Sequence, residues 1–159
     1  MRRLVLVAAI ACSGAHGPHH YHVQVAPGFT DTQSQAIFDA TAEWQGDSDG
    51  FVTFDGASSA TDVITVVPST GDAIVAEFGG GKIGYDETDG TSSTITIVTT
   101  LDALTFHQTA LHEIGHALGL VHMPPGNVMC ADTTCATLQV TCGDLGQLLQ
   151  RTVTDHCYP

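Results

Sequence analysis

Residues 112–122 read HEIGHALGLVH, with histidines at both ends and a third at position 116. Residues four apart in a helix differ by about 40° of rotation and about 6 Å of rise. His112 and His116 therefore project from one helical face. Two imidazoles placed in this way can both lie ~2.1 Å from a single zinc ion, for which neutral imidazole is a preferred ligand. The segment predicts a helix that carries two ligands for one zinc ion.

A third histidine reaches the same ion only if the helix ends after His116. Glycine adopts the left-handed conformation at little steric cost and commonly ends helices. Gly119 lies where this turn is needed, so His122 is predicted to return as the third ligand. Three histidine ligands leave a fourth position open for water or substrate, as in catalytic rather than structural zinc sites.

Glu113 directly follows the first predicted ligand. From that position its carboxylate can accept a proton from the attacking water and pass it to the leaving amine. Glu113 is therefore the predicted general acid/base, and the predicted reaction is hydrolysis of a peptide bond.

The pattern extends to a methionine downstream, Met129. By chance, HExxH arises in roughly one chain of this composition in a hundred, and the pattern with Gly119 and His122 in roughly one in ten thousand. The motif resembles the metzincin signature of zinc endopeptidases, and ALHEIGHALGL is most similar to the matrixin branch. Ala131 stands where astacin-like and serralysin-like branches have Tyr, which disfavours those two.

The resemblance implies an α+β catalytic domain. In this fold a twisted mixed sheet of about five strands carries an N-terminal helix, an active-site helix and a C-terminal helix. Met129 would form the Met-turn beneath the zinc ligands without binding metal. An edge strand above the cleft would hold the substrate backbone by β-augmentation, and we place it at residues 80–85. The alternative for these residues is an ordinary glycine-rich hairpin.

Local patterns predict the other elements. A helix opens with a capping box at Thr30 and Gln33 and turns Ile37, Ala40 and Trp44 inward. Strands are predicted at residues 21–25, 51–54, 63–67, 73–78 and 94–98. A second capping box, at Thr105 and Gln108, starts the zinc helix near Phe106 and runs it through Leu118. A last helix begins after Thr141 and carries Leu145, Leu148 and Leu149.

The amino-terminal residues predict export. Residues 1–15 have two arginines, a short apolar run and then small residues, the layout of a signal peptide. The run is too short to span a bilayer. An alternative is a bacterial lipobox at residues 9–12, with a lipid anchor on Cys12. We expect a secreted or extracytoplasmic protein with a flexible terminus at residues 16–20, followed by a catalytic domain at residues 21–159.

Within that domain, residues 123–159 form a predicted cysteine-bearing subdomain. Once Cys12 is removed from disulfide chemistry, the cysteines that remain are Cys130, Cys135, Cys142 and Cys157. An even number in an exported protein predicts two disulfides. Pairing of neighbours, 130 with 135 and 142 with 157, is favoured among three connectivities.

The acidic composition excludes some partners. The 159 residues fit one domain, and the formal net charge of −13 opposes binding to nucleic acid or to anionic lipid. Acidic side chains can also bind calcium, and Asp86, Glu87 and Asp89 are the candidate ligands. A solvated acidic turn is the favoured interpretation of that segment.

The predicted function is a monomeric, secreted zinc metalloendopeptidase that acts on protein or peptide substrates. The alternative is a non-catalytic, zinc-containing peptide-binding surface protein or lipoprotein, against which the intact Glu113 argues. A structural zinc site is a third hypothesis and needs a fourth protein ligand. The nearest candidate, His107, lies about 140° around the helix from His112.

Overall fold

One mixed sheet forms the base of the molecule. The computed structural model describes residues 19–55, 62–78, 82–89, 91–132 and 136–149. The strands are β1 (His19–Val25), β2 (Val52–Asp55), β3 (Asp62–Ser69), β4 (Gly84–Asp89) and β5 (Ser92–Val98). Their order is β2-β1-β3-β5-β4, with every neighbouring pair parallel except β4 and β5. This confirms the predicted mixed sheet of five strands and leaves β4 at one edge.

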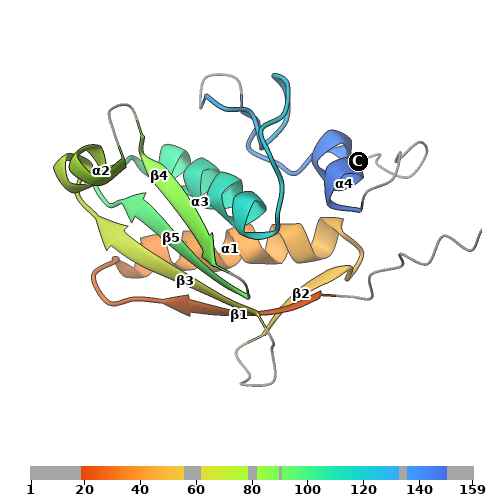
Figure 1. Ribbon diagram of the computed structural model, residues 1–159, viewed down its shortest axis with the longest axis horizontal. Coiled ribbons are helices and arrows are strands. Elements are labelled where there is room, and N and C mark those ends of the chain that lie inside the picture. Colours follow the sequence, from red (N-terminus) through yellow and green to blue (C-terminus); the bar gives the residue numbers. More distant parts are fainter. Residues whose placement is uncertain (1–18, 56–61, 79–81, 90, 133–135, 150–159) are drawn as a thin grey trace, which may run out of the picture.

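Two long helices cover the sheet (Figure 1). The helices are α1 (Asp31–Asp47), α2 (Gly71–Phe78), α3 (Ala103–Ala117) and α4 (Cys142–Leu148). α1 packs against α3, and α3 also contacts β4 and β5. The core lies between these helices and the inward side chains of the strands, and α3 packs beside the edge strand. None of the helices in the described ranges is long and apolar enough to cross a membrane.

α1 forms as its sequence predicts. The Thr30 hydroxyl accepts from the backbone N–H of Gln33, whose side chain returns to the Thr30 N–H, so the predicted capping box is present. Ile37, Ala40 and Trp44 are all fully buried. The Trp44 indole N–H also donates to the backbone carbonyl of Leu111 at 3.0 Å, and this bond ties α1 to the zinc helix.

The prediction of a strand at residues 73–78 is wrong, because this segment belongs to α2. The Thr70 hydroxyl accepts from the Ala73 N–H, and the Thr70 carbonyl accepts from the Ile74 N–H, so a helical turn starts here. Ile74 is fully buried, whereas Val75 is 48% exposed. A short apolar run cannot be assigned to strand or helix by periodicity alone, which explains the error.

Several other boundaries differ from the prediction. β1 begins at His19, two residues earlier than expected, while residues 1–18 lie outside the described part of the chain. The edge strand is β4, at Gly84–Asp89 rather than at residues 80–85. The acidic residues Asp86, Glu87 and Asp89 therefore lie in this strand, which pairs along its length with β5. The prediction of a solvated turn at these residues is wrong. The glycine-rich residues 79–81 lie outside the described ranges.

α3 begins earlier than predicted, at Ala103, and its N-cap is Asp102. The Asp102 carboxylate accepts from the backbone N–H groups of Leu104 and Thr105 and from the Thr105 hydroxyl. The predicted capping box at Thr105 and Gln108 is therefore wrong, because Thr105 lies inside the first turn. α4 begins directly after Thr141, as predicted, and buries Leu145.

Candidate metal centre and cleft

α3 presents the predicted metal ligands on the face opposite the core. Leu111 and Ile114 on this helix are buried among the residues of α1 and the sheet. His112 and His116 lie one turn apart on the other side, with ring centroids 4.7 Å apart. The helical spacing in the sequence thus places the two imidazoles together, as expected.

The chain turns sharply after α3 and returns with His122. Gly119 has a φ of +89°, in the left-handed region that the sequence predicts for this position. His122 Nε2 then lies 3.2 Å from His116 Nε2. The ligand atoms of His112, His116 and His122 all lie within 4.8 Å of one another. All three predicted metal ligands therefore meet at one point.

Backbone carbonyls orient two of these rings. The Nδ1 atom of His112 lies 2.9 Å from the Val128 carbonyl oxygen, and that of His116 lies 2.8 Å from the Leu120 carbonyl oxygen. A carbonyl oxygen can only accept a hydrogen bond, so Nδ1 carries the proton in both rings. Each Nε2 therefore has a free lone pair, which faces the place where the three histidines meet. Burial lowers the pKa of His112 to about 4, which keeps its imidazole neutral. The three residues therefore fit a divalent transition metal such as zinc.

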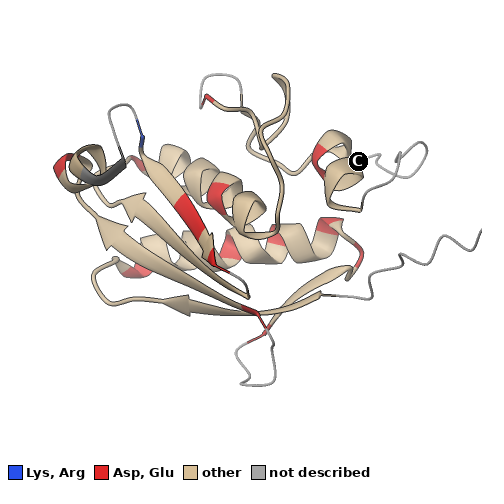
Figure 2. Cartoon of the chain, viewed as in Figure 1, with Lys and Arg blue, Asp and Glu red and all other residues tan. Residues whose placement is uncertain are grey.

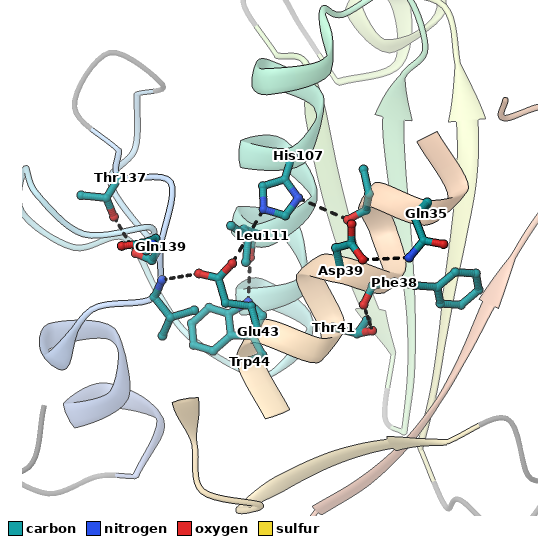
Figure 3. A network of polar contacts seen from close by, with 12 residues as sticks. Gln35, Phe38, Asp39, Thr41, Glu43, Trp44, His107, Leu111, Thr137 and Gln139 are labelled. Carbon is teal, nitrogen blue, oxygen red and sulfur yellow. Dashed lines mark hydrogen bonds and ion pairs between the residues drawn. The ribbon is translucent and has the colours of Figure 1, made fainter. Parts of the chain in front are cut away.

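His107 does not join this cluster. Its Nδ1 lies 3.3 Å from the Ala36 carbonyl oxygen, and its Nε2 lies 3.7 Å from the Glu43 carboxylate (Figure 3). Both contacts face α1, away from the other three histidines. The fourth protein ligand that a structural zinc site requires is thus not supplied by this residue.

Met129 is fully buried, and its sulfur lies against α3 at Gly115. A Cβ on Gly115 would overlap the Met129 sulfur, so the glycine allows the sulfur to approach the helix backbone between the two ligands. The Met123 N–H donates to the Met129 carbonyl at 2.7 Å and closes the turn. The assignment of Met129 to a Met-turn stays a prediction from the resemblance.

Asp144 holds this turn, and the sequence interpretation missed it. Its buried carboxylate accepts from the N–H groups of Val128, at 3.0 Å, and Met129, at 3.1 Å. It also caps α4 by accepting from the Thr141 N–H and hydroxyl. Because the Val128 carbonyl orients His112, Asp144 acts on the metal centre through the backbone. The spacing of Thr141 and Asp144 signals a capped helix, but nothing in it indicates contact with the Met-turn.

Glu113 faces the cleft beside the histidines and is only 7% exposed. A Cβ on Gly84 of β4 would lie 2.6 Å from the Glu113 carboxylate, so the glycine allows the strand to approach closely. The pKa of Glu113 is raised to about 8, mainly by burial and also by the nearby Asp86 carboxylate, while Lys82 acts in the opposite direction. Lys82 is the one lysine or arginine in the described ranges, whereas Figure 2 shows acidic residues on β4 and on all four helices.

A cavity of about 550 Å³ lies between β4, α3 and the segment after the Met-turn. Its lining includes the three histidines and Glu113, together with Gly84 and Asp86 from β4. Gln108 and Ala136 also line it, and the Gln108 amide donates to the Ala136 carbonyl at 3.0 Å. The histidine cluster thus opens into a cleft bounded on one side by the edge strand.

The calcium interpretation gains no support. In the described ranges, the three histidines are the only group of three or more His, Cys, Asp or Glu residues whose ligand atoms converge. Asp86 and Glu87 are neighbours in β4, so their side chains point to opposite faces of the sheet. Asp86 instead accepts from the Thr88 hydroxyl at 2.9 Å.

Comparisons with known proteins agree with this geometry. A family model described as matrixin matches residues 15–143. High choriolytic enzyme 1, a hatching enzyme zinc-protease from Oryzias latipes (medaka fish), is similar at 20% identity with a TM-score of 0.50. The match covers 68% of this chain and 47% of that chain, so the present chain spans about half the length of the hatching enzyme.

A second solved structure is similar over more of its length. Archaemetzincin from Methanopyrus kandleri has a TM-score of 0.57 at 13% identity, and the match covers 89% of this chain and 98% of that chain. No match was found among curated protein sequences. At these identities, the two structures support the likeness of the fold.

The chain folds as a mixed five-stranded sheet packed against a helix that carries two of three clustered histidines, an arrangement similar to metzincin-type zinc protease folds. Because the matrixin model matches residues 15–143, more than half of the chain, the chain belongs to the matrixin family.

Proposed function

We propose that this chain is a secreted, zinc-dependent endopeptidase that cleaves peptide bonds within protein or peptide substrates. The observation that carries the proposal is the convergence of His112, His116 and His122 beside the buried Glu113, in a cleft beneath an edge strand. Three neutral imidazoles and one position for water or substrate are the arrangement of a catalytic zinc site.

Each residue of the site has a distinct role in this proposal. When bound by the three imidazoles, zinc would polarise the scissile carbonyl and lower the pKa of a water molecule. Glu113 takes a proton from the attacking water and passes it to the leaving amine. Met129 packs beneath the histidines and supports their arrangement without binding the metal.

The position of β4 supports an extended substrate. β4 is the last strand in the sheet order, and Gly84 lies directly against Glu113. A peptide that pairs with the outer edge of β4 by β-augmentation would place a backbone carbonyl over the histidine cluster. Internal peptide bonds, rather than chain ends, suit such a cleft.

Export and disulfide bonding belong to the same proposal and rest on the sequence pattern. Residues 1–15 resemble a signal peptide and lie outside the described ranges. Each favoured disulfide has one member, Cys135 or Cys157, that also lies outside them. Cleavage after residue 15 gives a freely secreted enzyme, whereas processing at Cys12 gives a lipid-anchored one.

Metal removal tests the proposal. We expect the zinc-loaded protein to cleave a proteome-derived peptide library, to lose cleavage when a zinc chelator is added, and to regain it with stoichiometric zinc. Circular dichroism should show the fold intact without metal, because the core does not depend on the histidines. Peptide binding without cleavage would contradict the proposal and support the non-catalytic alternative. Unfolding on chelation would instead identify a structural zinc site.

A further inference from the structure

The three histidines of the cluster are held in different ways. The imidazoles of His112 and His116 each donate from Nδ1 to a backbone carbonyl, that of Val128 and that of Leu120. Within the described ranges, the ring of His122 makes no bond of this kind, and its Nε2 lies 3.2 Å from that of His116. His122 is also exposed and follows α3 instead of belonging to a helix. Its position therefore depends on what holds the backbone on either side of it.

One side chain of α4, that of Gln147, holds this backbone on both sides of His122. Its amide oxygen accepts from the Val121 N–H at 2.8 Å, and its Nε2 donates to the Met123 sulfur at 3.3 Å. Leu145 of the same helix is buried, so α4 gives the amide a fixed base. A single amide thus restrains the residue before the third predicted ligand and the residue after it.

The same amide also reaches His116 through one peptide group. The carbonyl of Leu120 and the N–H of Val121 belong to a single trans peptide unit, so they point in opposite directions. The carbonyl accepts from His116 Nδ1 at 2.8 Å, while the N–H donates to Gln147. Hydrogen bonds that are linked in a chain polarise one another. Gln147 therefore restrains the acceptor that orients the second predicted ligand.

An equivalent chain holds the first predicted ligand and ends on Asp144, three residues earlier in α4. The Val128 carbonyl accepts from His112 Nδ1 at 2.9 Å, and the N–H of the same peptide unit, that of Met129, donates to Asp144 at 3.1 Å. Residues three apart lie on the same side of a helix. α4 thus presents Asp144 and Gln147 to the two peptide units that orient the ligands of α3.

We propose that Gln147 is a positioning residue of the metal centre, which holds the segment around His122 and the peptide unit that orients His116. This inference rests on the proposed function, in which the three histidines bind zinc. Removal of a group that orients metal ligands typically lowers metal affinity by about 10–100-fold. Val121 is 65% exposed, so water can take the place of the amide at its N–H. Loss of Gln147 should therefore change zinc affinity more than the stability of the fold.

Truncation of Gln147 tests the proposal through zinc affinity. We expect Gln147→Ala to raise the Kd for zinc by about tenfold in competition with a zinc-binding dye. The midpoint of urea unfolding of the metal-free protein should stay close to that of the wild type. Gln147→Glu keeps an oxygen that accepts from the Val121 N–H, so its Kd should return to the wild-type value or fall below it. Gln147→Ser repeats the truncation with a polar residue, in case the alanine variant folds poorly.

Gln35→Ala is the matched control, because it truncates an exposed glutamine of α1 that donates to Asp39. Its Kd for zinc should equal that of the wild type. An unchanged Kd in both truncations of Gln147, or an equal rise in Gln147→Glu, would overturn the proposal.

Nuclear magnetic resonance separates positioning from a general loosening of the site. In the zinc-loaded protein with ¹⁵N-labelled histidine, the Nδ1 protons of His112 and His116 report on the two peptide units separately. We expect Gln147→Ala to shift the His116 resonance and to leave that of His112 in place, whereas equal shifts of both would overturn the proposal. Neither zinc affinity nor these resonances depend on cleavage. Absence of cleavage by the wild type would therefore refute the endopeptidase without deciding the role of Gln147, which the zinc Kd of Gln147→Ala decides.

Discussion

Replacement of Glu113 by alanine is expected to reduce peptide hydrolysis by about 10²–10⁴-fold while zinc stays bound. The carboxylate faces the cleft but is not one of the three converging ligand groups, so its removal takes away the proton acceptor and leaves the metal centre in place. Initial rates on one cleaved peptide, together with the zinc content of each protein by mass spectrometry, measure the two effects separately.

Glu113→Gln is the matched variant for this experiment. It keeps the size of the side chain in the narrow space against Gly84 but cannot accept the proton. The two variants should lose activity to a similar extent. Substantial hydrolysis by either one at full zinc content would show that another group acts as the base.

Replacement of Asp144 by alanine is expected to lower the free energy of unfolding by about 3 kcal/mol or more, because hydrogen bonds to a charged group contribute about 1.5–3 kcal/mol each. The fully buried carboxylate accepts from the backbone N–H groups of Val128, Met129 and Thr141, and alanine leaves these donors without their acceptor. Zinc affinity should also fall, by about tenfold or more, because the Val128 carbonyl would no longer orient His112 firmly.

Urea unfolding and competition with a zinc-binding dye measure the two consequences. Asp144→Asn should be intermediate, since its amide keeps one acceptor oxygen but turns an N–H₂ group toward backbone donors. Asp72→Ala, which removes an exposed carboxylate from the first turn of α2, controls for the change in net charge. If Asp144→Ala unfolded at the same urea concentration as Asp72→Ala, the role assigned to Asp144 would be wrong.

Features that depend on local spacing could be predicted from the sequence. The four-residue repeat of His112 and His116 sets a helical face, and Gly119 marks the turn that brings His122 back. The inward residues of α1 follow from their periodicity in the same way. In each case a rule that spans a few residues determines the structure.

Features that depend on contacts between distant segments could not be predicted. Asp144 acts through backbone groups some fifteen residues away, and backbone groups leave no pattern of side chains. Gln108 has the spacing of a helix-capping residue, whereas its amide donates to the carbonyl of Ala136, 28 residues further along the chain. Residues 73–78 are helical because of the cap at Thr70 and the burial of Ile74, and neither can be predicted from a short apolar run.

The central claim is that His112, His116 and His122 hold one zinc ion with a fourth position open to water or substrate. X-ray absorption at the zinc edge of the zinc-loaded protein tests it directly. The account predicts three imidazole nitrogens at about 2.0–2.1 Å and one oxygen ligand completing a four-coordinate site. A sulfur ligand at about 2.3 Å, or four protein ligands with no oxygen from solvent, would contradict it.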